Sequence, residues 1–201
     1  MTVTAGEAPT IDGRSARGLE NRRRIVAAML TLVGAGNPSP SAEDIAAEAN
    51  VGLRTVFRHF DDMDSLFREM NATVRAELRP IVEAELAGAT WRERLETLIE
   101  RRGVVFEKML PYKSAADARR HGSDFLQQEH IRLVKQLRYT LVAVLPPSTA
   151  RETPLLEALD LALSFESWRR LRVDQQLSIA QAHRTMSLIA QALTVDVGDP
   201  S

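Results

Sequence analysis

The stretch NVGLRTVFRHF, residues 50–60, interleaves basic side chains with apolar ones. On a helix of 3.6 residues per turn, Val56 would lie on the inner face, while Leu53, Arg54 and Arg58 would face outward. Guanidinium groups can bind phosphate oxygens and can pair with the edges of bases. The stretch is therefore a candidate surface for nucleic-acid recognition, with a strand or a core helix as the plainer alternatives.

A second group of arginines precedes the first apolar helix. Residues 14–24 contain five arginines against Glu20 alone, five minus one, a local charge of +4. A plainer interpretation is a solvated helix face after a loose tail. Residues 1–70 as a whole hold eight arginines and ten acids, eight minus ten, or −2, and the full chain has a net charge of −1. Binding to a polyanion would therefore depend on the placement of individual arginines.

Several classes of site have no sequence signal. The chain has no cysteine, which excludes thiolate metal sites, thiol nucleophiles and disulfides. It has no Glu-x-x-His pair, no phosphate-binding loop and no Gly-x-Ser-x-Gly elbow, so an enzyme is the less favoured class. We expect no cofactor and no metal. The N-terminal residues do not resemble a secretory signal and no apolar run approaches the roughly 20 residues of a membrane span, so a cytoplasmic protein is expected.

The spacing of apolar residues predicts an all-α fold. They recur at intervals of three and four along the chain, and period-two alternation is nowhere sustained. Prolines are expected to end or kink a helix at Pro80 and to end one at Pro111. Polar pairs three residues apart indicate helix starts, namely Ser41 with Asp44, Asp61 with Asp64, Thr90 with Glu93 and Ser178 with Gln181.

A helix expected over residues 154–173 is apolar on more than one face. Such a helix lies either at the centre of a bundle or against a second chain. Because one similar helix follows it, we favour a dimer interface formed by the last two helices. The residues assigned to that interface are Leu155, Leu159, Phe165, Ile179, His183 and Met186.

The stretch SAEDIAAEANVGLRTVFRHF has the layout of a helix-turn-helix. Ala46 is a small residue where two helices would cross, and Asn50 is at the turn, where a left-handed backbone is common. The segment 22–66 resembles the DNA-binding domain of TetR-family (tetracycline-repressor-like) transcriptional regulators, through IVAAMLTL, AEDIAAEANV, RTVFRHF and DSL at the same spacing. The C-terminal stretch FESWRRLRVDQQLSIAQAHRTM is similar to the last two helices of such regulators.

The resemblance implies a ligand-responsive regulator, most often a repressor, that binds a palindromic DNA operator as a homodimer and is released by a small-molecule effector. It implies a flexible basic arm over 1–18, a DNA-binding domain over 19–66, and an effector-binding and dimerisation domain over 67–196. The residues expected at DNA are Arg22, Arg23, Ser41, Leu53, Arg54, Thr55, Phe57, Arg58 and His59. The side chains expected to line an effector pocket are Trp91, Phe106, Met109, Tyr112, Phe125, His130, Tyr139 and Trp168.

Two positions depart from the family pattern. Phe57 stands where many members have a tyrosine, and Met63 stands where a lysine commonly begins the next helix. Both changes remove a group that could bind phosphate. A helical interaction protein with a degenerate helix-turn-helix therefore stays open as an alternative, and an all-α enzyme is a more remote one.

Overall fold

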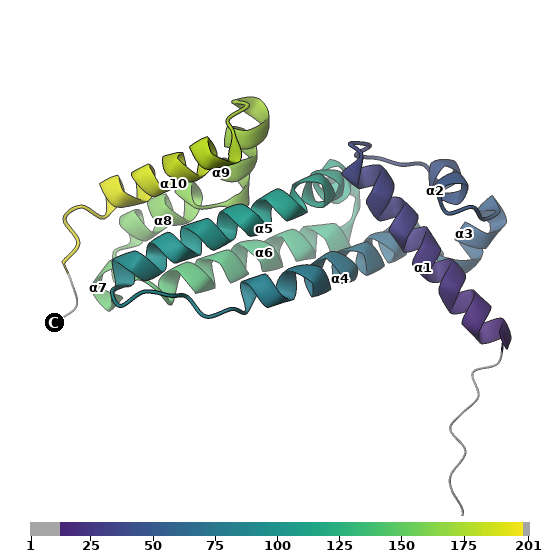
Figure 1. Ribbon diagram of the computed structural model, residues 1–201, viewed down its shortest axis with the longest axis horizontal. Helices are drawn as coiled ribbons and strands as arrows, with labels where there is room; N and C mark the ends of the chain where they lie inside the picture. Colours follow the sequence, from purple (N-terminus) through teal and green to yellow (C-terminus); the bar gives the residue numbers. More distant parts are fainter. Residues whose placement is uncertain (1–12, 199–201) are drawn as a thin grey trace, which may run out of the picture. The chain divides into compact units, whose positions relative to one another are not determined.

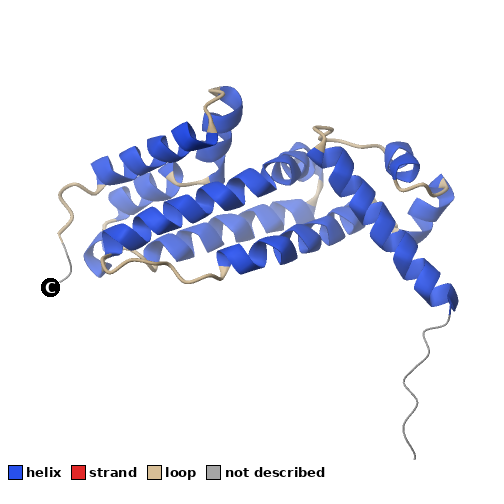
Figure 2. Ribbon diagram, in the orientation of Figure 1, coloured by secondary structure: helices blue, strands red, loops and turns tan. Residues whose placement is uncertain are grey.

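The chain forms two compact units, which divide between Met70 and Asn71. The computed structural model describes residues 13–198, and its regular elements within that range are all helical (Figure 2). The division falls inside α4 (Met63–Val82), so one helix belongs to both units. The domain boundary placed at residue 66 from the sequence lies about one helical turn earlier.

Three further helices complete the first unit (Figure 1). They are α1 (Gly13–Gly34), α2 (Ala42–Glu48) and α3 (Leu53–His59). α1 ends just before Gly36, whose φ of +96° is a left-handed conformation that a side chain would strain. Residues 13–18 of the expected arm lie in α1, and residues 1–12 lie outside the described residues.

The core of the first unit takes buried side chains from α1, α2 and α4, and the helices α1, α2 and α3 pack on one another. Its fully buried side chains come from apolar stripes with helical spacing, which is why these helices pack rather than remain apart. The largest of them are Ile25, Met29, Ile45, Leu66 and Phe67.

The second unit is a bundle in which α10 packs on α5 and α8, and α6 also packs on α5 and α8 (Figure 1). Its core includes an edge-to-face contact between Phe106 and Phe165, with ring centroids 5.7 Å apart, and Trp168 beside them. Beyond α4, its elements are α5 (Trp91–Arg119), the 3-10 turn η1 (Arg120–Gly122), α6 (Asp124–Val142), α7 (Pro147–Arg151), α8 (Thr153–Ala162), α9 (Phe165–Arg169), the π-helical turn η2 (Arg170–Asp174) and α10 (Ile179–Leu193).

Three expected helix boundaries are wrong. α5 continues through Pro111 to Arg119, because Lys113 and Ala115 beyond the proline are buried and hold the helix in place. The helix after α3 is capped by Asp62, which accepts a hydrogen bond from the Ser65 amide at 2.7 Å, rather than by Asp61.

The single helix expected over 154–173 is divided into α8, α9 and η2. The division lies at Leu163 and Ser164. The Ser164 hydroxyl accepts a bond from the Ser167 amide and so begins α9 as a separate helix. None of the helices over residues 13–198 is long and apolar enough to cross a membrane.

Candidate nucleic-acid interface and ligand pocket

The exposed face of α3 carries the side chains expected to read bases. Val56 is buried against the first unit, whereas Leu53, Arg54 and Arg58 are exposed. Phe57 is also exposed, with 56% of its surface accessible, which is high for an aromatic ring in a folded domain. The short helix therefore presents two guanidinium groups and two apolar side chains.

The turn between α2 and α3 is fixed by a contact that the sequence did not reveal. Asn50 has a φ of +50°, in the left-handed region as expected for an asparagine at this point. The Arg24 guanidinium donates hydrogen bonds to the backbone carbonyls of Ala49 and Asn50. Arg24 thus satisfies carbonyls that the end of α2 leaves without an intrahelical partner.

Arg22, expected at DNA, instead holds α3 and α4 together. Its Nε donates to Glu69 at 2.6 Å and its Nη1 donates to the backbone carbonyl of His59 at 2.6 Å. The same guanidinium lies 4.4 Å from the centre of the Phe60 ring. Arg22 therefore has a structural role, whereas its neighbour Arg23 is exposed.

His59 is also turned inward. Its Nε2 is buried and accepts or donates no hydrogen bond among the described residues. Burial lowers the pKa of His59, and the charges of Arg58 and Arg22 lower it further. A neutral imidazole with a buried nitrogen does not fit the phosphate contact expected of it, whereas the partly exposed Thr55 remains available.

Ser41 is at the N-terminus of α2, as expected, but two of the backbone amides there, those of Ser41 and Asp44, are already bonded within the chain. The Ser41 hydroxyl accepts a bond from the Asp44 amide, and the Asp44 carboxylate accepts one from the Ser41 amide at 3.0 Å. These bonds lower the pKa of Asp44, so the carboxylate stays charged. Its negative charge at the helix start opposes a phosphate there.

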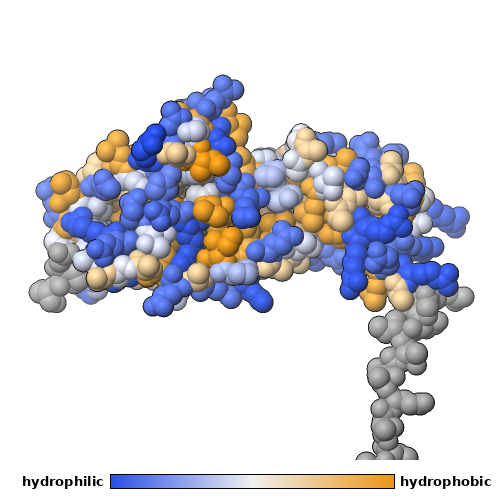
Figure 3. All heavy atoms as spheres, viewed as in Figure 1, coloured by the Kyte–Doolittle hydropathy of each residue, from blue (hydrophilic) through white to orange (hydrophobic). Residues whose placement is uncertain are grey.

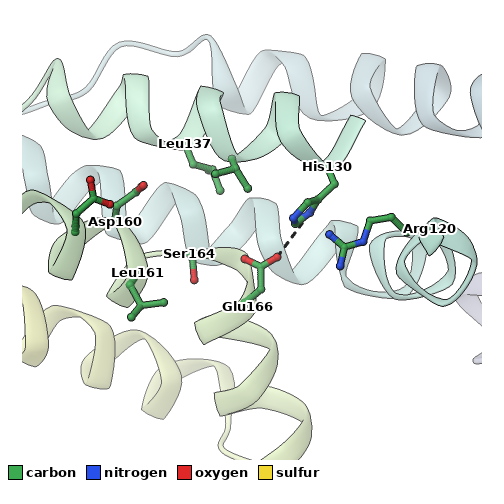
Figure 4. Close-up of a pocket in the computed structure, with 9 residues that line it drawn as sticks. Arg120, His130, Leu137, Asp160, Leu161, Ser164 and Glu166 are labelled. Carbon is green, nitrogen blue, oxygen red and sulfur yellow. Dashed lines mark ion pairs between the residues drawn. The ribbon is translucent and has the colours of Figure 1, made fainter. Parts of the chain in front are cut away.

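The second unit contains a pocket of about 390 Å³ between α6, α8 and α9. Figure 4 shows Arg120, His130 and Glu166 at one end, Asp160 at the other, and Leu137 between them. This volume is within the range of small-molecule sites. The lining residues are Arg120, His130, Val134, Leu137, Glu157, Asp160, Leu161, Ser164 and Glu166.

Of the side chains offered for an effector pocket, His130 lines this one. Trp91, Phe106 and Trp168 are core residues instead, because their large apolar surfaces pack among α5, α9 and α10. Tyr139 lies on the surface, with 70% of its area exposed. The remaining three, Met109, Tyr112 and Phe125, are partly buried and do not line it.

Half of the residues assigned to a dimer interface are interior residues of one subunit. Leu159, Phe165 and Met186 are fully buried in the core of the second unit, so they cannot also contact a second chain. Ile179 is exposed, and Leu155 and His183 are partly buried. The exposed apolar side chains of α8 and α10 include two that were not assigned, Leu161 and Leu188.

A buried arginine, Arg102, was missed from the sequence. It is 2% exposed and donates to the carbonyl of Leu163 at 2.8 Å, to that of Leu137, and to the Thr140 hydroxyl at 3.2 Å. Burial lowers its pKa to about 10, against the attraction of Asp160. Its place in the apolar stripe of α5, between Ile99 and Phe106, is the signal that could have found it.

The comparisons agree with this geometry. Residues 26–70 match the family model "Bacterial regulatory proteins, tetR family". No match is found among curated proteins. The fold is similar to a transcriptional regulator from Rhodococcus sp. Rha1, with a TM-score of 0.65 and 15% identity over 87% of this chain and 96% of that one.

Two other solved structures share the fold. One is a putative TetR-family regulator from Syntrophomonas wolfei, with a TM-score of 0.61 and 18% identity over 90% of this chain and 96% of that one. The other is the multidrug-binding protein EbrR in complex with imidazole, with a TM-score of 0.58 and 19% identity over 91% and 97%. Two of these three structures are of transcriptional regulators, and EbrR is a multidrug-binding protein. Residues 26–70 therefore match the model of bacterial regulatory proteins of the tetR family, and the chain as a whole shares the all-α fold of these solved structures.

Proposed function

We propose that the protein is a repressor that binds a palindromic operator as a homodimer and is released by a small-molecule effector bound in its second unit. The observation that carries the proposal is the outward face of α3, where Arg54 and Arg58 stand beside Leu53 on a helix anchored through Val56. A recognition helix of this kind reads bases in the major groove.

A gel-shift series tests the proposal. Duplexes from the region upstream of the protein's own gene are titrated with the full chain at several salt concentrations, with a scrambled duplex as the control. A shift specific to one palindromic segment supports the regulator. Equal or absent shifts at every salt concentration support the helical interaction protein instead. A reporter gene under that segment then distinguishes repression from activation.

Replacing Arg58 with alanine is expected to relax sequence choice. If the guanidinium reads a guanine, the change costs about 1–3 kcal/mol at the cognate site and little on random DNA. Fluorescence anisotropy with both duplexes measures the difference. Arg23→Ala is the matched control, since an exposed phosphate contact should weaken binding to both duplexes alike. Equal losses for Arg58→Ala would assign Arg58 to phosphate as well.

One helix offers the route by which ligand binding would reach DNA. In the second unit, Asn71 on α4 donates to Glu129 of α6 at 2.6 Å, and Arg75 pairs with the same carboxylate. Glu129 directly precedes the pocket residue His130. In the first unit, the same α4 carries Glu69, which holds Arg22 against the end of α3. A displacement of α6 by the ligand would therefore be transmitted along α4.

Dimerisation is proposed through exposed apolar side chains of α8 and α10. Figure 3 shows apolar residues among hydrophilic ones on the surface of α10. Leu188 is 66% exposed there, and Leu161 of α8 and Val195 beyond α10 are also exposed. A second copy of the chain would remove these side chains from water.

Leu188→Arg is expected to convert the dimer into a monomer, because an arginine at the centre of an apolar interface would be buried without a partner. Light scattering coupled to size-exclusion chromatography measures the mass. The matched control is Tyr139→Arg, a change at an equally exposed apolar residue of α6, which should leave the mass unchanged. Loss of the dimer in both variants, or in neither, would contradict the assignment of the interface to α10.

A further inference from the structure

We infer that the pocket between α6, α8 and α9 binds an amphipathic organic cation, whose N–H groups are held by the Glu166 carboxylate and the His130 imidazole. The inference rests on the proposed function, since it names the chemical class of the effector. Two observations support it, namely the distribution of charged side chains around the pocket and the buried Nδ1 atom of His130.

Two of the acids that line the pocket, Glu157 and Asp160, already have a basic partner. Arg138 bonds to Glu157 at 2.6 Å and to Asp160 at 3.2 Å, so these two carboxylates share one guanidinium. The far end of the pocket is thus an ion-pair network, and the two acids there have their charge partly neutralised. At the opposite end, Arg120 lies 3.6 Å from Asp117, too far for a hydrogen bond, and its Nε is buried without a hydrogen-bond partner among the described residues.

Glu166 lacks such a partner among the described residues. Its nearest basic atom is the Nδ1 of His130, at 3.9 Å, which is too far for a hydrogen bond. Burial lowers the pKa of His130, and the positive charges of Lys113 and Arg120 lower it further, outweighing Glu166 and Asp117. The imidazole is therefore neutral at pH 7, and it supplies no positive charge to the carboxylate.

The Nδ1 of His130 is also without a hydrogen bond. It is buried, and no group in residues 13–198 donates to it or accepts from it. Buried polar atoms almost always have a partner. With the ring proton on Nε2, Nδ1 is an acceptor. An ammonium or amidinium group carries several N–H donors and can bridge Nδ1 and the Glu166 carboxylate, where an anion or a pure acceptor would find only Arg120.

The rest of the pocket fits an apolar body. Val134, Leu137 and Leu161 line it between the two polar ends. A volume of about 390 Å³ holds a ring and a short substituent with room to spare. The ligand that satisfies all three features is an aromatic or aliphatic group bearing one nitrogen cation.

Three probes of nearly equal size and shape separate charge from shape: benzamidine is a cation, benzamide is neutral and benzoate is an anion. Each is titrated into the full chain without DNA, by isothermal calorimetry. We expect benzamidine to bind about tenfold more tightly than benzamide, the size of effect that one charge-assisted pair gives, and benzoate to bind most weakly.

Glu166→Gln should remove the preference for benzamidine over benzamide, because the amide keeps the shape and loses the charge. Half of the Glu166 side chain is exposed, so the fold should tolerate the change. Glu152→Gln is the matched control, an exposed glutamate ahead of α8 that does not line the pocket and should keep the preference.

Tightest binding of benzoate would overturn the inference and would assign the pocket to anions through Arg120. A preference for benzamidine that survives in Glu166→Gln, or no binding of any probe at millimolar concentration, would also overturn it. Because these titrations contain no DNA, they are independent of the gel shift. If no gel shift is seen but benzamidine is still preferred, the proposal that the protein is a DNA-binding repressor is rejected. The inference that the pocket binds an organic cation is then still supported.

Discussion

Replacing Arg22 with alanine is expected to lower the free energy of unfolding of the first unit by about 2 kcal/mol and to weaken DNA binding on every sequence. The guanidinium bonds to Glu69 and to the His59 carbonyl and lies over Phe60. A hydrogen bond to a charged group contributes about 1.5–3 kcal/mol, and a cation over an aromatic ring about 0.5–1. Glu69 is partly exposed, so screening by solvent reduces that part of the sum.

The effect on DNA follows from where these bonds lie. His59 is the last residue of α3, and its carbonyl is held by Arg22. Without that donor, the recognition helix loses its fixed angle to α1 and α4. The affinity for cognate and random duplexes should therefore fall together, unlike the selective loss expected for Arg58→Ala.

Urea unfolding followed by circular dichroism measures the first effect, and anisotropy measures the second. Arg23→Ala is the control, because Arg23 is the exposed neighbour on the same helix. It should unfold at the wild-type urea concentration and should reduce the slope of log K against log salt by about 0.9, the value for one phosphate contact. Equal unfolding midpoints for the two variants would refute the structural role of Arg22.

Arg102→Ala is expected to lower the free energy of unfolding of the second unit by about 3–4 kcal/mol. The change removes the Arg102 donor from the Leu163 carbonyl and from the Leu137 carbonyl, which keeps the Thr140 hydroxyl as a donor at 2.8 Å, and it leaves a cavity beside α6 and α8. Unsatisfied buried acceptors cost about 1–3 kcal/mol, and an unfilled cavity adds to that cost. The Leu163 carbonyl is at the end of α8. The packing of α8 and α9 should therefore be lost first when the second unit of this variant unfolds.

Arg102→Met distinguishes the two contributions. Methionine keeps most of the volume and removes the cost of burying a cation, which is the cause of the lowered pKa of Arg102. We expect a loss of about 1–2 kcal/mol, roughly half that of alanine, because the Leu163 carbonyl loses its donor. Tryptophan fluorescence in urea measures both variants, since Trp91 and Trp168 lie in this unit. Wild-type stability of the alanine variant would contradict the assigned role.

Much of the fold was predictable because local signals agree with packing. The capping boxes at Ser41, Thr90 and Ser178 all form, and the apolar stripe of the first helix is buried. The outward face of α3 is also as predicted. The spacing of apolar residues in α3 is enough to show which face of this helix is buried. The exposed face could therefore be predicted from this one helix, without knowing how the rest of the chain folds.

The roles of individual arginines were less predictable, because a run of like residues does not show which one faces inward. Arg22 precedes Ile25 by three residues and so lies on the buried stripe of α1, as Arg102 lies on that of α5. An arginine in register with apolar residues is the signal to use.

The pocket of the second unit was least predictable from the sequence. Bulky side chains such as Phe106 and Trp168 fill space rather than line it, because packing favours their burial in the core. The pocket is formed instead by residues from α6, α8 and α9 that are far apart in sequence, and by a break at Ser164 that divides one expected helix into two.

The contact of Arg24 with the turn has a consequence for how the domain can evolve. Within residues 13–198, the hydrogen bonds of the Arg24 guanidinium go to the main-chain carbonyls of Ala49 and Asn50, and a main-chain carbonyl is the same for every amino acid. Substitutions at the exposed position 50 can therefore accumulate without breaking the bond, provided that the new residue accepts a positive φ. Position 24 has no such freedom. The residue whose replacement would disturb this turn most is therefore Arg24, which lies 26 residues before Asn50 in the sequence.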